Sequence, residues 1–247
     1  MTIIVTQINK FGIVLGSDSN ISNDRTVIKE DKKIFEIRKL KSALCTAGSY
    51  SVNGTILSEW LLNFISGNES KYSTLKEFTE LLSKTLEDEM NPEEKKALSI
   101  THIAGYQGNH PEMWCISNTR LQDNGQYGEG ENNFHYSEDL WNNAREKNKL
   151  ETGFNISNGL NYQLYINGFI SGRVAFHVAR KFIDNYFSLM WQASDYKFRP
   201  PQNIEEHKII VELYIDLIDR IFQLSNYEPK IIGGKTQTFV INNPTLP

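Results

Sequence analysis

The order of strand-like and helix-like segments most constrains how this chain can fold. Strand-like segments come first, two helices follow, two strands come next, and then two more helices and a final strand. Strands and helices are clustered along the chain, which disfavours alternating βαβ units. Clustering favours layered sheets with helices packed outside, so we predict an α+β fold, compatible with a four-layer α/β/β/α sandwich.

The strand predictions rest on β-branched residues and short apolar runs bounded by turn residues. A turn at 9–12 separates the first two runs, and the continuous apolar run at 13–15 is typical of a strand covered on both faces. A Gly-Asn-His-Pro turn at 108–111 indicates a hairpin. The predicted strands are residues 2–8, 13–15, 25–29, 32–37, 42–46, 97–107, 112–118 and 235–242.

The helix predictions rest on apolar residues spaced three or four positions apart. They give helices over 51–64, 174–190 and 204–224. Another helix begins at Thr74, which has the capping-box spacing with Glu77, and ends before Asn91. Residues 199–201, Arg-Pro-Pro, separate the last two helices because proline interrupts a helix.

The length of 247 residues corresponds to about 1.6 domains of average size. Residues 120–162 are polar and irregular, with a short helix around Trp141 as their one regular feature. We predict a single domain over 1–247 with inserts at about 120–162 and 187–205.

Charge and hydropathy exclude two classes of partner. The chain has 26 Lys+Arg against 30 Asp+Glu, a net charge of −4, and so lacks the basic excess of a general nucleic-acid binder. No apolar run approaches the 18 residues of a membrane helix, and the N-terminus lacks the basic region of a signal peptide. We therefore expect a cytoplasmic protein that binds neither nucleic acid nor membrane.

Cysteine and histidine patterns predict no metal and no cofactor. Cys45 and Cys115 each lie in an apolar stretch, as structural cysteines do, and the five histidines show no ligand spacing. Residues 233–236, Gly-Gly-Lys-Thr, resemble the end of a phosphate-binding loop, but Pro229 stands where that motif needs its first glycine. No serine lies in a GxSxG elbow, and adjacent carboxylates such as Glu87 and Asp88 are typical of a solvated helix face.

One constellation of residues points to chemistry. Thr2 follows the initiator methionine, and a small second residue permits removal of that methionine. An N-terminal threonine carries a hydroxyl nucleophile and an α-amine with a pKa near 8, so nucleophile and base share one residue. Asp18 and Lys33 lie at strand ends, where an ion pair could stand beside the threonine and lower the proton affinity of its amine and hydroxyl.

Four segments resemble the start of a proteasome β-type subunit, a member of the N-terminal-nucleophile hydrolases. They are Thr-Ile-Ile-Val at 2–5, Gly-Ile-Val-Leu-Gly-Ser-Asp-Ser at 12–19, Lys-Lys-Ile-Phe-Glu-Ile at 32–37 and Thr-Ala-Gly at 46–48. The similarity is to the bacterial proteasome-like (Anbu-like) group more than to eukaryotic subunits. Residues 104–118 resemble the family's central hairpin, and 168–180 resemble the entry to its third helix.

The resemblance implies a threonine peptidase. It makes Thr2 the nucleophile, Lys33 a cation held by Asp18, and the Gly48 N–H the oxyanion donor. It also implies a polypeptide substrate and a homo-oligomeric ring or helical assembly, and it leaves an ATPase or adaptor partner open. Four further residues lie near the positions of the family's substrate pocket: Ile21, Asp31, Thr46 and Tyr50.

The chain departs from the family at three supporting positions. A serine expected near the third helix is replaced by Phe169 or Ile170, with Ser171 close enough to substitute. An Asp and a Ser expected around the last turn are replaced by Pro229 and Ile232. Two alternatives therefore stay open: an inactive proteasome-fold subunit serving as scaffold or binding module, and a small-molecule amidase on the same fold.

Overall fold

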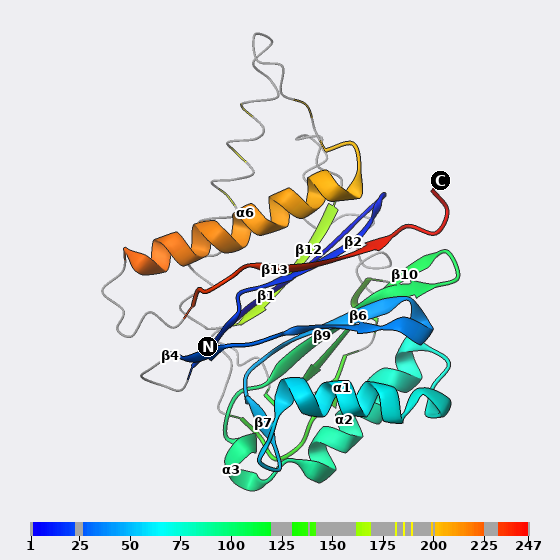
Figure 1. Ribbon diagram of the computed structural model, residues 1–247. Coiled ribbons are helices and arrows are strands. Elements are labelled where there is room, and N and C mark those ends of the chain that lie inside the picture. The colour runs from blue at the N-terminus through cyan, green and yellow to red at the C-terminus, as the bar shows by residue number, and fades with distance from the viewer. Residues whose placement is uncertain are drawn as a thin grey trace.

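The computed structural model describes residues 2–22, 27–119, 130–137, 139–141, 162–168, 201–224 and 232–246, with single positions at 181, 185, 189 and 199. These residues form a mixed α+β structure built on two main sheets, which confirms the predicted fold class at that level (Figure 1). Nowhere in these described ranges does a helix combine the length and apolar character needed to cross a membrane.

The first sheet is antiparallel and has the strand order β12-β1-β2-β13. The predicted hairpin between its two N-terminal strands is confirmed, since Ile4 pairs with Ser17 and Asn9 with Gly12. Strand β12 was not predicted, although it pairs with β1 along its whole length. The strands are β1 (Ile3–Asn9), β2 (Gly12–Ser17), β12 (Tyr162–Gly168) and β13 (Gln237–Asn242).

The second sheet has the order β11-β10-β9-β6-β5 and is also antiparallel. Its central hairpin turns at Gly108, whose φ of 60° favours glycine, so the predicted turn is confirmed and is tighter than expected. Strand β11 lies within the segment predicted to be an insert. The strands are β5 (Ile34–Ile37), β6 (Ser42–Ala47), β9 (Ile100–Gln107), β10 (His110–Ser117) and β11 (His135–Tyr136).

The two sheets face each other across an apolar core. Side chains of β1 and β2 that point inward pack against inward side chains of β6, β9 and β10, including Ile4, Ile8, Ile13, Leu15, Ala43, Cys45, Ala104 and Met113. Every residue of β1, β2 and β6 is buried. The apolar run at 13–15 therefore belongs to a strand covered on both faces, as predicted.

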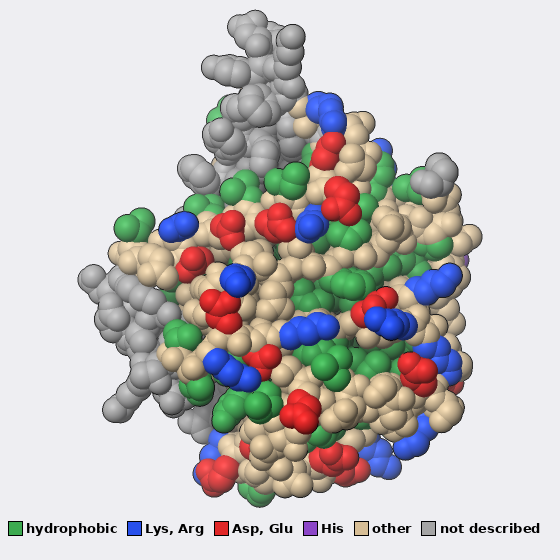
Figure 2. All heavy atoms as spheres, in the orientation of Figure 1, with side chains coloured by type: hydrophobic (Ala, Val, Ile, Leu, Met, Phe, Trp, Pro, Cys, Tyr) green, Lys and Arg blue, Asp and Glu red, His purple; other side chains and the backbone are tan. Residues whose placement is uncertain are grey.

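Helices cover the outer faces of both sheets. Helix α6 (Ile204–Gln223) packs Val211, Tyr214 and Ile218 onto the first sheet, and Asn203 caps its N-terminus. Helices α1 (Leu57–Gly67) and α2 (Leu75–Glu89) pack onto the second sheet. Figure 1 shows α6 on one side of the sheet pair and α1 and α2 on the other. On the face in Figure 2, acidic and basic side chains are interspersed and form no patch of one sign.

The start of the predicted helix over 51–64 is wrong. Residues Asn53 and Gly54 form the turn of a short hairpin between β7 (Ser51–Val52) and β8 (Thr55–Ile56), and α1 begins only at Leu57. Both turn residues have positive φ, 48° and 78°, which is the conformation that Asn-Gly favours in hairpin turns.

The cap of α2 is confirmed in part. Thr74 Oγ1 accepts a hydrogen bond from Glu77 N at 3.1 Å. The Glu77 carboxylate accepts the Ser73 N–H at 2.7 Å, one residue before the N–H that the reciprocal bond of a capping box uses.

The remaining described elements are short. Strands β3 (Asn20–Ser22) and β4 (Val27–Glu30) form a separate ribbon, and β5 begins two residues later than the predicted strand at 32–37. Helix α3 spans Pro92–Lys95, and the strand predicted at 97–107 begins only at Ile100. Helical turns η1 (Arg38–Leu40) and η2 (Glu69–Lys71) complete the set. The predicted helix over 174–190 lies almost wholly outside the described residues.

Candidate active site

Four predicted site residues each lie directly beside the end of a strand. Thr2 precedes β1, Asp18 follows β2, Lys33 precedes β5 and Gly48 follows β6. The first two strands belong to one sheet and the other two to the second, so the stacking of the sheets brings the four strand ends together.

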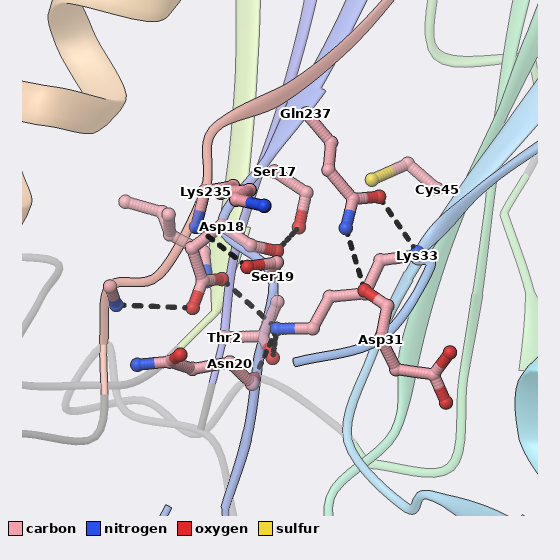
Figure 3. Close-up of polar contacts among 12 residues, drawn as sticks. Thr2, Ser17, Asp18, Ser19, Asn20, Asp31, Lys33, Cys45, Lys235 and Gln237 are labelled. Atoms are coloured by element: carbon pink, nitrogen blue, oxygen red, sulfur yellow. Dashed lines mark hydrogen bonds and ion pairs between the residues drawn. The ribbon is translucent and has the colours of Figure 1, made fainter. Parts of the chain in front are cut away.

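Lys33 is the centre of this cluster (Figure 3). Its Nζ donates to Thr2 Oγ1 at 2.6 Å, to Asp18 Oδ1 at 3.2 Å and to the Asn20 carbonyl at 2.5 Å. An ammonium has three N–H donors, and here each has an acceptor. The geometry is therefore that of a charged lysine that holds the Thr2 hydroxyl in place.

Asp18 is fixed from two directions. Its Oδ1 accepts the backbone N–H of Ile3 at 3.0 Å as well as Lys33 Nζ, and its Oδ2 accepts the N–H of Gly233 at 3.3 Å. Asp18 thus ties the residue after Thr2 and the turn before β13 to the lysine. A carboxylate with three charge-assisted partners is strongly held.

Burial dominates the electrostatics of this ion pair. Lys33 is 2% exposed and Asp18 is 1% exposed. Burial lowers the pKa of Lys33, and the Asp18 carboxylate opposes that shift. Burial likewise raises the pKa of Asp18, against Lys33 and the N–H groups of Ile3 and Gly233. Each group depends on the other to keep its charge in a site from which water is excluded.

A narrow pocket adjoins the cluster and has a cavity volume of about 20 Å³. The structure brings the four predicted substrate-pocket residues together in its wall, beside Thr2, Lys33 and Gly48. These four are Ile21, Asp31, Thr46 and Tyr50. Asp18 is not one of the wall residues, but it pairs with Lys33, which is.

Gly48 has a backbone that only glycine accommodates. Its φ is +121°, and a Cβ at this position would lie 2.2 Å from the carbonyl oxygen of Leu98 and 2.4 Å from Ser99 Cα. The backbone of Gly48 consequently packs tightly against the start of β9 while forming part of the pocket wall. Donation from its N–H to an oxyanion stays a prediction.

Asp31 is the acidic residue in the pocket wall, which also contains Lys32 and Lys33. Its carboxylate accepts hydrogen bonds from Lys29 Nζ at 2.7 Å, Ser58 Oγ at 2.9 Å and Lys32 N at 2.8 Å. Partial burial raises the pKa of Asp31, but these hydrogen bonds outweigh burial and hold the pKa below its ordinary value. Asp31 therefore stays ionised and anchors β4 and α1 to the wall.

Other predicted positions lie elsewhere. Ser171, Phe169, Ile170 and Pro229 lie outside the described residues. Ile232 is 1% exposed and belongs to the apolar cluster beneath α6.

Residues 233–236 contribute to the site in a way the sequence did not reveal. They lead into β13 and not into a helix, so the prediction of a strand at the C-terminal end is confirmed. Gly233 binds Asp18, and a Cβ on Gly234 would lie 2.4 Å from Ser19 Oγ. Two consecutive glycines indicate close backbone approach, which is the signal that could have identified this turn.

Both cysteines are free thiols. Cys45 is buried between the sheets, as predicted, whereas Cys115 is partly buried and packs against the same apolar cluster. Burial raises the pKa of Cys45 and of Cys115 to about 12, so neither is a reactive thiolate at neutral pH. Among the residues whose placement is described, no three His, Cys, Asp or Glu side chains are grouped as metal ligands.

Comparison with protein-family models and with curated proteins gave no match to this chain. The interpretation of the site consequently rests on its own geometry. That geometry comprises a threonine hydroxyl held by a buried lysine, an aspartate that holds the lysine, and an adjacent pocket with a glycine in its wall. Such a site is suited to nucleophilic attack by the threonine on a carbonyl group.

Proposed function

We propose that this protein is an N-terminal-nucleophile hydrolase, a threonine-type peptidase of proteasome-like architecture. In this proposal residues 1–247 form one domain with the four-layer α/β/β/α sandwich of that family. Support comes from the two facing antiparallel sheets with α6 on one outer face and α1 and α2 on the other.

The observation that carries the proposal is the 2.6 Å hydrogen bond from Lys33 Nζ to Thr2 Oγ1. This bond joins the hydroxyl of the proposed nucleophile to a lysine that is 2% exposed and paired with a buried aspartate. Hydrolytic removal of Met1 converts the Thr2 nitrogen into a free α-amine next to that hydroxyl. The nearby ammonium lowers the proton affinity of the amine and so keeps part of it neutral at pH 7.

The proposed reaction has two stages. Thr2 Oγ attacks the substrate carbonyl carbon, its proton passes to the α-amine, and the oxyanion is stabilised by the Gly48 N–H. The amine returns the proton to the leaving nitrogen as the C–N bond breaks, which leaves an ester on Thr2. The amine then takes a proton from water, and the hydroxide attacks the ester carbonyl carbon. As the C–O bond to Thr2 breaks, the ammonium returns its proton to Thr2 Oγ, which releases the carboxylic acid product and regenerates threonine.

We infer a polypeptide substrate, with one substrate side chain in the pocket beside Asp31 and Tyr50. We also infer a cytoplasmic homo-oligomer in a ring or helical arrangement. These inferences rest on the family resemblance of residues 2–48, and an ATPase or adaptor partner stays open.

Two specific observations support the alternatives. Ile232, in the apolar cluster beneath α6, stands where the family has a polar residue that orients the amine, which favours an inactive scaffold subunit. The small volume of the pocket, about 20 Å³, favours a small-molecule amidase.

Turnover assays distinguish the three functions. The purified protein is incubated with fluorogenic peptides and, separately, with small N-acyl amides, next to Thr2→Ala as the inactive control. The proposal predicts peptide hydrolysis that Thr2→Ala abolishes. Hydrolysis of the small amides alone would support the amidase. No turnover of either substrate by a chain that begins at Thr2 would contradict both enzyme functions and favour the inactive subunit.

A further inference from the structure

The segment that carries Lys33 lies between strands and lacks a full ladder of hydrogen bonds. Residues 31–33 connect β4 to β5. Two backbone contacts hold this segment, from Asp31 N to the Ser19 carbonyl at 2.9 Å and from Thr46 N to the Lys33 carbonyl at 3.0 Å. The Asp31 carbonyl and the Lys33 N–H are left for other partners.

Gln237 supplies both of those partners. It is the first residue of β13, a strand of the first sheet, and its side chain reaches the segment that precedes β5 of the second sheet (Figure 3). Its Oε1 accepts the Lys33 N–H at 3.0 Å, and its Nε2 donates to the Asp31 carbonyl at 2.6 Å. The two bonds together require a side chain that accepts at one atom and donates at another, as a carboxamide does.

The two residues that Gln237 holds have different places in the site. Lys33 carries the ammonium that contacts Thr2 Oγ1, whereas the Asp31 side chain forms part of the pocket wall. A shift of this segment would therefore move the ammonium and the wall together.

We propose that Gln237 is a positioning residue: its one side chain holds both the Lys33 ammonium and the part of the pocket wall formed by Asp31 in place. Its catalytic consequence rests on the proposed peptidase function, but its effect on Lys33 does not. Displacement of a catalytic group by about 1 Å can reduce a rate about a hundredfold. Loss of the two Gln237 hydrogen bonds should therefore change both kcat and KM measurably.

A glutamate at 237 separates positioning from packing. When protonated, Gln237→Glu can donate one O–H and accept at its other oxygen, as the amide does. When ionised, it accepts only, and it confronts the Asp31 carbonyl with a negative oxygen. The kcat of Gln237→Glu relative to the native protein should therefore fall as the pH rises through the pKa of the introduced carboxyl. Gln237→Met has neither the donor nor the acceptor, so its kcat should be lower than the native value by about tenfold or more at every pH.

The neighbouring Thr238 provides a matched control. Its Oγ1 donates to Glu212 of α6 at 3.0 Å, on the side of β13 away from the site. Thr238→Val removes one side-chain hydrogen bond from the same strand without touching the Lys33 segment. We expect its kcat and KM to stay within about twofold of the native values.

The experiment records kcat, KM and the NMR resonance of Lys33 Nζ for the native protein and all three variants between pH 5 and 8. Support requires a changed Lys33 resonance in Gln237→Met, a pH-dependent one in Gln237→Glu, and the native one in Thr238→Val. A native Lys33 resonance in both Gln237 variants overturns the inference, whatever the activity. Absence of Thr2-dependent turnover in the native protein refutes the proposed function, while the Lys33 resonance still decides the positioning role. If Gln237→Met fails to fold, the isosteric Gln237→Glu decides it alone.

Discussion

Replacement of Lys33 by methionine should destabilise the protein strongly, because it leaves the buried Asp18 carboxylate without its partner charge. Lys33 Nζ and Asp18 Oδ1 are 3.2 Å apart, and both residues are almost fully buried. Coulomb's law gives about 5 kcal/mol for that separation at an effective dielectric constant of about 20. Removal of one member of a buried pair typically costs about 3–5 kcal/mol. We therefore expect Lys33→Met to lower the free energy of unfolding by about 3–5 kcal/mol at pH 7.

The pH dependence of this loss follows from the remaining carboxyl. Burial already raises the pKa of Asp18, and loss of Lys33 raises it further. A carboxyl whose pKa is higher in the folded state than in the unfolded state stabilises the folded protein while it is protonated. That stabilisation is lost as the pH rises. The destabilisation of Lys33→Met should therefore shrink as the pH falls from 7 toward 4.

Urea denaturation at pH 7 and pH 4 measures both effects, and Asp18→Asn with the double variant completes a thermodynamic cycle. The double variant should lose at least about 2 kcal/mol less than the sum of the single losses, because neither charge is left alone. A loss below about 1 kcal/mol in Lys33→Met, equal at both pH values, would refute the buried ion pair.

Three further predictions concern the surroundings of the site. Gly48→Ala should lower the free energy of unfolding by about 1–3 kcal/mol, because Gly48 has a positive φ and its Cβ would meet the Leu98 carbonyl. Gly67→Ala is the control: no atom lies within 4 Å of its Cβ, so the free energy of unfolding should not fall in the same denaturation assay. The Glu94 carboxylate accepts three hydrogen bonds from the β7–β8 hairpin and a fourth from Asn91 N, and together these outweigh partial burial and lower its pKa. Glu94→Gln should therefore cost about 1–2 kcal/mol at pH 7, and the difference from the native protein should vanish as the pH falls through the lowered pKa; an equal cost at all pH values would contradict this. Burial lowers the pKa of His102 to about 3, so its ring proton resonances should keep their neutral positions from pH 8 to pH 5 in NMR spectra, and a midpoint near 6.5 would contradict its burial.

Local patterns predicted most of the strands and the last long helix. The apolar run at 13–15 and the turn before it specify β2, and the 3.6-residue stripe over 204–224 specifies α6 nearly to the residue. Thr2, Asp18 and Lys33 could be proposed together from the chemistry of an N-terminal threonine beside an ion pair, whereas Gly48 joined them only through the family resemblance. Their meeting in space depends on the stacking of two sheets, which no local pattern contains.

The missed features depend on contacts between distant residues. Strand β12 is stabilised by pairing with β1, about 160 residues earlier in the chain, and its short mixed sequence carries little signal alone. Gln237 meets Lys33 across 204 positions and between two sheets. The β7–β8 turn is different: Asn53-Gly54 is a local hairpin signal that the apolar stripe of the following helix obscured.

The mass of the protein after treatment with a β-lactone tests the central claim most directly. A β-lactone acylates an activated hydroxyl and adds its whole mass, and peptide mapping locates the adduct. We predict a native protein that begins at Thr2 and carries one adduct on that residue, no adduct in Thr2→Ala, and much slower labelling in Lys33→Met. A chain that retains Met1, or an adduct that persists in Thr2→Ala, would contradict the assignment of Thr2 as the nucleophile.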